Sequence, residues 1–98
     1  MSLQADEEIV KTGTFLYDAL VTCDVRIVRS PICYGSGDHE DPPEIADDHA
    51  RETFYIQYGS TTERGRYTSG GRGYPTLSDA VDVVEGAPGF GSSVQWRD

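Results

Sequence analysis

Lysine is almost absent from this chain: seven of its eight basic residues are arginine, and only Lys11 is lysine. The 17 acidic residues give a formal net charge of −9. A chain this acidic repels phosphate backbones and anionic lipids, which argues against non-specific binding to nucleic acid or to membranes. Many aspartates with almost no lysine suit a salt-rich cytoplasm, but a GC-rich genome would also favour arginine over lysine. The low lysine content therefore fits both salt adaptation and genome composition.

Long apolar runs and a cysteine framework are also missing. No stretch approaches the roughly 20 apolar residues of a membrane span, and the first residues, MSLQADEE, lack the basic and apolar regions of a signal peptide. We therefore expect a cytoplasmic protein, in which thiols usually stay reduced. Cys23 and Cys33 are the only cysteines. We interpret them as small core residues, although on neighbouring strands they could meet if oxidised.

The 98 residues are enough for one small domain. Several segments alternate apolar and polar side chains with a period of two, which is typical of strands. Strands are expected at about 10–17, 20–30, 51–59, 66–68 and 93–97. Asp18–Ala19 is either a turn between the first two strands or a bulge in one long strand. Residues 1–8 are expected to fray.

The segment TLSDAVDVVEG, at about 76–86, is the one stretch with clear helical periodicity. Its apolar residues form one stripe, Thr76 can cap the first turn, and Gly86 can end the helix in a left-handed conformation. The glycine-rich run at 70–73 is predicted to be the connector into this helix. The expected fold is α+β: a small, mainly antiparallel sheet of about four to five strands, in the order β-β-loop-β-β-α-β, with one helix packed on one face.

Residues 34–50 form a long acidic loop without strand periodicity. A loop of more than about 12–15 residues is usually functional or disordered, and a short helical turn is expected near Pro43. Closely spaced carboxylates and imidazoles could bind a divalent cation, although the spacing matches neither an EF-hand nor HExxH. A mobile, solvated loop is the favoured interpretation. The candidate metal ligands are Asp38, His39, Glu40, Asp47, Asp48 and His49.

No catalytic constellation is recognisable in the sequence. The two histidines, His39 and His49, lack an evident partner, and a pair of Cys33 with His39 is disfavoured because Cys33 lies in a strand-like context. The glycine-rich run at 70–73 matches neither the P-loop nor the dinucleotide-binding pattern. An enzyme is therefore the least favoured class.

Charge and aromatic side chains are unevenly distributed along the chain. Residues 1–50 hold eleven acidic and three basic residues, whereas residues 51–98 hold six acidic and five basic residues. Such complementary halves predict that the arginines pair with carboxylates, either in the acidic loop or on a second subunit. The candidate interface or anion contacts are Tyr55, Arg64, Arg66, Tyr67 and Arg72.

A single helix covers only one face of a small sheet, and aromatic side chains on an uncovered face commonly mark an interface. We therefore predict a non-enzymatic interaction module that self-associates, as a dimer, through a sheet face or edge. The alternative is a metal- or small-ligand-binding domain that uses the acidic loop at 38–49. No other cofactor is indicated.

Overall fold

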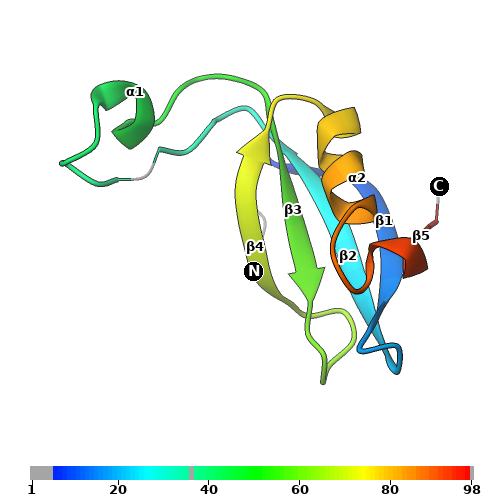
Figure 1. The fold of residues 1–98 in the computed structure, drawn as a ribbon. Helices are drawn as coiled ribbons and strands as arrows, with labels where there is room; N and C mark the ends of the chain where they lie inside the picture. The colour runs from blue at the N-terminus through cyan, green and yellow to red at the C-terminus, as the bar shows by residue number, and fades with distance from the viewer. Residues whose placement is uncertain (1–5, 36, 98) are drawn as a thin grey trace.

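The computed structural model describes residues 6–35 and 37–97, with the side chains of Ile45 and Arg72 left aside. Five antiparallel strands form one sheet in the order β4-β3-β2-β1-β5, and helix α2 packs on one face of it (Figure 1). This arrangement confirms the predicted α+β fold. The elements are β1 (Glu8–Tyr17), β2 (Val21–Ser30), α1 (Pro43–Ala46), β3 (Thr53–Gly59), β4 (Tyr67–Tyr74), α2 (Leu77–Glu85), a 3-10 turn (Gly91–Ser93) and β5 (Gln95–Trp96).

The core lies between α2 and the sheet. It consists of alternate residues of β1, β2 and β3 that meet the two fully buried residues of the helix, Ala80 and Val84. Its buried members are Phe15, Cys23, Val25, Ile27, Phe54, Ile56, Ala80 and Val84. Both cysteines are free thiols, and burial raises the pKa of Cys23, which is the behaviour of a structural rather than a reactive thiol.

Helix α2 begins where the sequence predicts it. The Thr76 hydroxyl accepts a hydrogen bond from the Asp79 amide at 3.0 Å, so the predicted N-cap is confirmed. The predicted left-handed end at Gly86 is wrong, because that residue has φ −91° and its amide bonds back to the carbonyl of Asp82. The left-handed residue of this region is Gly89, at φ 89°.

Asp18 and Ala19 form a turn between β1 and β2, which resolves the alternative left open by the sequence. Both residues adopt positive φ, at 53° and 58°, and the Leu20 amide donates to the Tyr17 carbonyl at 3.0 Å. The irregularity of β1 lies at its other end, between Ile9 and Lys11. The predicted fraying of residues 1–8 falls outside the described residues for 1–5, and β1 already begins at Glu8.

The prediction that residues 70–73 are a connector is wrong, because they belong to the edge strand β4. Gly73 pairs with Tyr55 and Gly70 pairs with Gln57. A Cβ atom at Gly73 would overlap the methyl group of Thr53 and lie 2.9 Å from Cε1 of Tyr55. Gly73 therefore allows a close approach of side chains from β3 and does not mark a turn.

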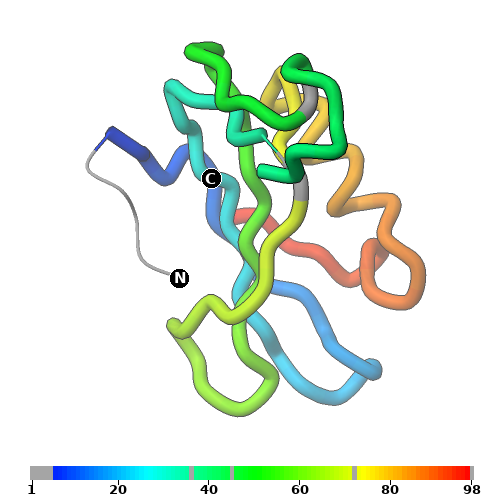
Figure 2. The backbone as a smooth tube through the Cα atoms, turned by 90° about the vertical axis from the view of Figure 1, so that its left-hand side faces the viewer, coloured from blue at the N-terminus to red at the C-terminus, as the bar shows by residue number. Residues whose placement is uncertain are grey.

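The two ends of the sheet differ in character. The acidic loop and α1 project at one end, beyond the β4 side of the sheet (Figure 1). At the other end, the β1–β2 and β3–β4 turns splay apart, with the β1–β2 turn leaning toward the side that carries α2 (Figure 2). Within the described residues, no helix has both the length and the apolarity needed to cross a membrane.

Candidate functional site

The acidic loop is held together by its own hydrogen bonds. Cys33 and His49 form an isolated antiparallel bridge, with N–O distances of 2.8 and 2.9 Å. The Asp48 carboxylate accepts the Gly35 amide at 2.8 Å, and the Asp38 carboxylate accepts the Glu40 amide at 2.9 Å. Helix α1 confirms the helical turn expected near Pro43. The loop is therefore a shaped, acidic projection.

The candidate metal ligands do not converge. Within residues 6–35 and 37–97, no three His, Cys, Asp or Glu side chains lie close enough to share a metal ion. Three of the candidates also contact the loop backbone, because Asp38 and Asp48 each accept an amide and His49 Nε2 lies 3.1 Å from the Glu44 carbonyl oxygen. This geometry supplies no assembled ligand set, and the metal site stays a prediction.

Arg64 pairs with a carboxylate of β2, at the end of the sheet opposite the acidic loop. Its Nη2 and Nε lie 2.9 and 3.1 Å from the two carboxylate oxygens of Asp24, which also accepts the Gly65 amide at 2.8 Å. The Arg64 guanidinium holds the pKa of the buried Asp24 below its usual value, and the Gly65 amide acts in the same direction. Asp24 thereby anchors the β3–β4 turn to the sheet.

Arg66 forms only a surface ion pair, with Nη1 at 3.3 Å from Glu63 in the same turn. The partners of Arg64 and Arg66 are therefore carboxylates of β2 and of the β3–β4 turn, not those of the acidic loop. The loop and this turn lie at opposite ends of the sheet (Figure 1). Within one copy of the chain, the acidic loop and these two arginines therefore stay apart.

The tyrosines of the predicted interface lie on the sheet face away from α2. The Arg26 guanidinium lies 4.0 Å from the centroid of the Tyr67 ring, and Arg26 Nε donates to Gln57 at 2.6 Å. The Tyr55 hydroxyl accepts the Tyr34 amide at 2.8 Å and donates to the Ile32 carbonyl at 3.3 Å. Burial raises the pKa of Tyr55 and of Tyr67. Both rings are thus held in place by residues of the same chain.

The two edges of the sheet are unequal. Beside β1, the short strand β5 and the 3-10 turn cover part of the edge, since the Leu16 amide donates to Ser93 Oγ and the Arg97 amide donates to the Thr12 carbonyl. At the opposite edge, β4 has eight residues, and residues 68–71 are exposed. In the part of the chain that the structure describes, no strand lies on the outer side of β4.

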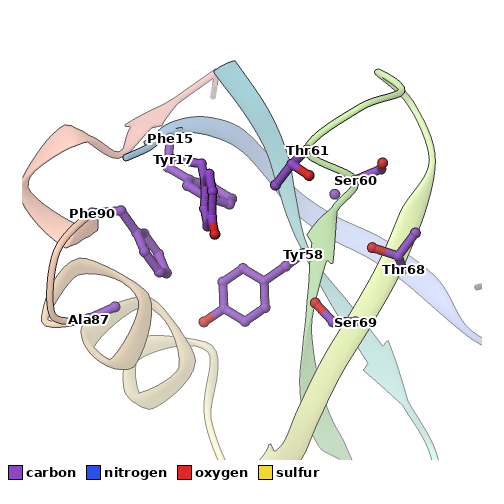
Figure 3. A pocket seen from close by; sticks show the side chains of 10 residues that line it. Phe15, Tyr17, Tyr58, Ser60, Thr61, Thr68, Ser69, Ala87 and Phe90 are labelled. Atoms are coloured by element: carbon purple, nitrogen blue, oxygen red, sulfur yellow. The ribbon is translucent and has the colours of Figure 1, made fainter. Parts of the chain in front are cut away.

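The structure also contains a pocket that the sequence did not predict. It encloses about 490 Å³ between the splayed turns of the two hairpins and the loop after α2 (Figure 3). It is lined by Phe15, Tyr17, Tyr58, Gly59, Ser60, Thr61, Thr68, Ser69, Ala87 and Phe90. These residues come from four separate segments, and only the aromatic Phe90 in a glycine-rich loop gave a local signal. Comparison of the chain with family profiles, with curated proteins and with solved structures found no match.

Proposed function

We propose that this protein is a non-enzymatic, cytoplasmic interaction module that forms a homodimer by pairing the β4 strands of two copies. The observation that supports this proposal best is the edge position of the eight-residue strand β4, of which residues 68–71 are exposed. Edge strands are templates for pairing with another chain, and proteins commonly block them with lysine or proline. Strand β4 contains neither residue, and its only charged residue is Arg72.

The charge distribution favours an antiparallel arrangement of the two copies. A two-fold axis beside β4 pairs each strand with its own copy in the opposite direction. It also brings the acidic end of each protomer next to the β3–β4 turn of its partner. Residues 38–48 carry six carboxylates, whereas the turn carries two arginines, Arg64 and Arg66, and one carboxylate, Glu63. The acidic loop projects beyond the β4 side of the sheet (Figure 1). In the dimer, the loop of each protomer would therefore lie beside the β3–β4 turn of its partner, and the two-fold axis would repeat this contact.

Substitution of Gly71 by lysine is expected to raise the dimer dissociation constant at least about tenfold. Gly71 lies near the middle of β4, so the two new ammonium groups would approach each other across the two-fold axis. A Cβ atom at Gly71 meets nothing within 4 Å, so the monomer accommodates the side chain. Sedimentation velocity over a range of protein concentrations measures the effect.

The matched control is Gln95→Lys, which makes the same charge change in β5 at the opposite edge. This variant should dimerise like the wild-type protein. A wild-type chain that stays monomeric at several hundred micromolar would contradict the self-association itself, whereas equal effects of the two substitutions would contradict the use of the β4 edge.

Charge reversal at Arg66 tests the antiparallel arrangement. Arg66→Glu should weaken the dimer roughly three- to tenfold at low salt, because one exposed ion pair contributes about 0.2–1 kcal/mol and reversal replaces attraction by repulsion. The effect should shrink in high salt, which screens exposed charges. Arg51→Glu makes the same charge change at the acidic end and should not weaken the dimer. A parallel arrangement would instead place like ends together, so Arg51→Glu would weaken the dimer and Arg66→Glu would not.

A further inference from the structure

Four aromatic rings form one side of the pocket between the hairpin turns. Phe15 and Phe90 pack with their centroids 4.4 Å apart. The Tyr58 ring stands nearly at right angles to both, at 88° to Phe15 and 78° to Phe90, and Tyr17 completes the group at the rim. These rings are in direct contact with one another, so they form one packed aromatic wall of the pocket.

The lining of this pocket carries no formal charge, and its surroundings favour a cation. Aromatic faces are the negative side of the ring quadrupole and attract cations. The protein as a whole has a net charge of −9, which raises the local concentration of cations and repels anions. At the rim, an adjoining hollow that shares Tyr17 and Phe90 also includes Asp18. Among the described residues, no hydrogen bond or ion pair engages the Asp18 carboxylate.

The other side of the pocket is polar but uncharged. The hydroxyl groups of Thr61, Thr68 and Ser69 line the wall across from Phe90, and the Tyr58 ring extends from that wall with its hydroxyl toward the side of Phe90 and Ala87 (Figure 3). Burial raises the pKa of Tyr58, so its hydroxyl stays protonated and can donate a hydrogen bond at neutral pH. A ligand that fits this pocket therefore has an apolar, positively charged end and a neutral, hydrogen-bonding end.

We propose that this pocket binds a methylated ammonium group that is attached to a neutral polar tail. The methyl groups pack against this aromatic wall beside Tyr17, the positive charge faces the rings and Asp18, and the tail meets the hydroxyl wall. Quaternary ammonium recognition by several aromatic rings is the best-known use of cation–π attraction. The volume of about 490 Å³ lies within the usual range for small-ligand pockets. Thr68 and Ser69 belong to β4, the strand of the proposed dimer contact, whereas the aromatic side of the pocket belongs to β1, β3 and the loop after α2.

Choline and its neutral carbon isostere, in which carbon replaces the quaternary nitrogen, are the probes for this proposal. Titration of each into the full chain, followed by amide NMR spectra, should show choline binding at least about fivefold more tightly than the isostere. The largest shifts should fall at Tyr58, Ser69 and Phe90. Equal or tighter binding of the isostere would overturn the assignment to a cation, and shifts that cluster elsewhere would overturn the site.

The Asp18→Asn variant tests the rim charge without threatening the fold. Asparagine tolerates the positive φ of 53° at this position. The variant should bind choline roughly threefold more weakly and the isostere equally well, since it removes only one exposed charge. Asp82→Asn, which removes one charge from the exposed surface of α2, should leave both affinities unchanged. If the two variants reduce choline binding equally, the rim carboxylate has no part in the site.

Discussion

Substitution of Gly73 by alanine is expected to lower the free energy of unfolding by about 1–3 kcal/mol, the usual cost of overpacking. For a domain of this size, each 1 kcal/mol corresponds to roughly 4–8 °C in melting temperature. The same substitution at Gly71, two residues earlier in β4, should change the stability by less than about 0.5 kcal/mol. Thermal and urea unfolding at one fixed protein concentration measure both effects.

The difference between the two glycines arises from what surrounds them. An added Cβ at Gly71 meets nothing within 4 Å. At Gly73 it would overlap the methyl group of Thr53 and lie 2.9 and 3.0 Å from the ring of Tyr55. Neither neighbour can move easily, because Thr53 is buried and bonded to the Arg51 carbonyl. The Tyr55 ring is fixed through its hydroxyl, which bonds to the chain at 32–34.

If Gly73→Ala were as stable as the wild-type protein, Thr53 and Tyr55 would have to move aside without a loss of stability. The steric explanation for this glycine would then be wrong. A large loss of stability in Gly71→Ala would point instead to a general need for glycine in β4. The fixed protein concentration matters in both cases, because dimer formation adds a concentration-dependent term to the stability.

The misassigned glycine-rich run shows why part of the fold could not be predicted. Locally, Gly70-Gly71-Arg72-Gly73 has the composition of a turn. Its strand conformation depends on pairing with β3 and on the space required by Thr53 and Tyr55, which are about 20 residues earlier in the chain. By contrast, α2 was predicted closely because its signals are local: a capping threonine, an apolar stripe and a following proline.

The candidate site, too, could be predicted only where the signal is local in the sequence. The sequence identified the acidic loop and the arginines as charged groups, because charge is visible residue by residue. It could not show that they lie at opposite ends of the sheet, or that Arg64 pairs with Asp24, since both facts depend on how the strands are ordered. The pocket was missed for the same reason, because its walls come from four segments that only the fold brings together.

Replacement of Asp24 by asparagine is the other change with a large expected effect. It should lower the free energy of unfolding by about 1.5–3 kcal/mol at neutral pH, the usual contribution of hydrogen bonds to a charged group. Asp24 is 8% exposed and accepts three hydrogen bonds, two from Arg64 and one from the Gly65 amide. An uncharged amide cannot replace all three acceptor contacts.

The matched control is Asp82→Asn, which removes one charge from the exposed surface of α2 and should change the stability by less than about 0.5 kcal/mol. Comparable losses in the two variants would show that net charge, rather than the anchoring of the β3–β4 turn, determines the result. The loosened turn should also appear as faster amide exchange at Gly65, whose donor would lose its carboxylate partner.

The pH dependence gives this prediction a second, independent measurement. Because Arg64 lowers the pKa of Asp24 in the folded chain, the carboxylate contributes its full stability above the ordinary value of 3.8. That contribution is lost as the pH falls through the lowered value in the folded state. The difference in stability between the wild-type protein and Asp24→Asn should therefore be constant from about pH 5 upward and shrink below about pH 4. A difference that stays constant down to pH 2 would show that the Asp24 charge is not what anchors the turn.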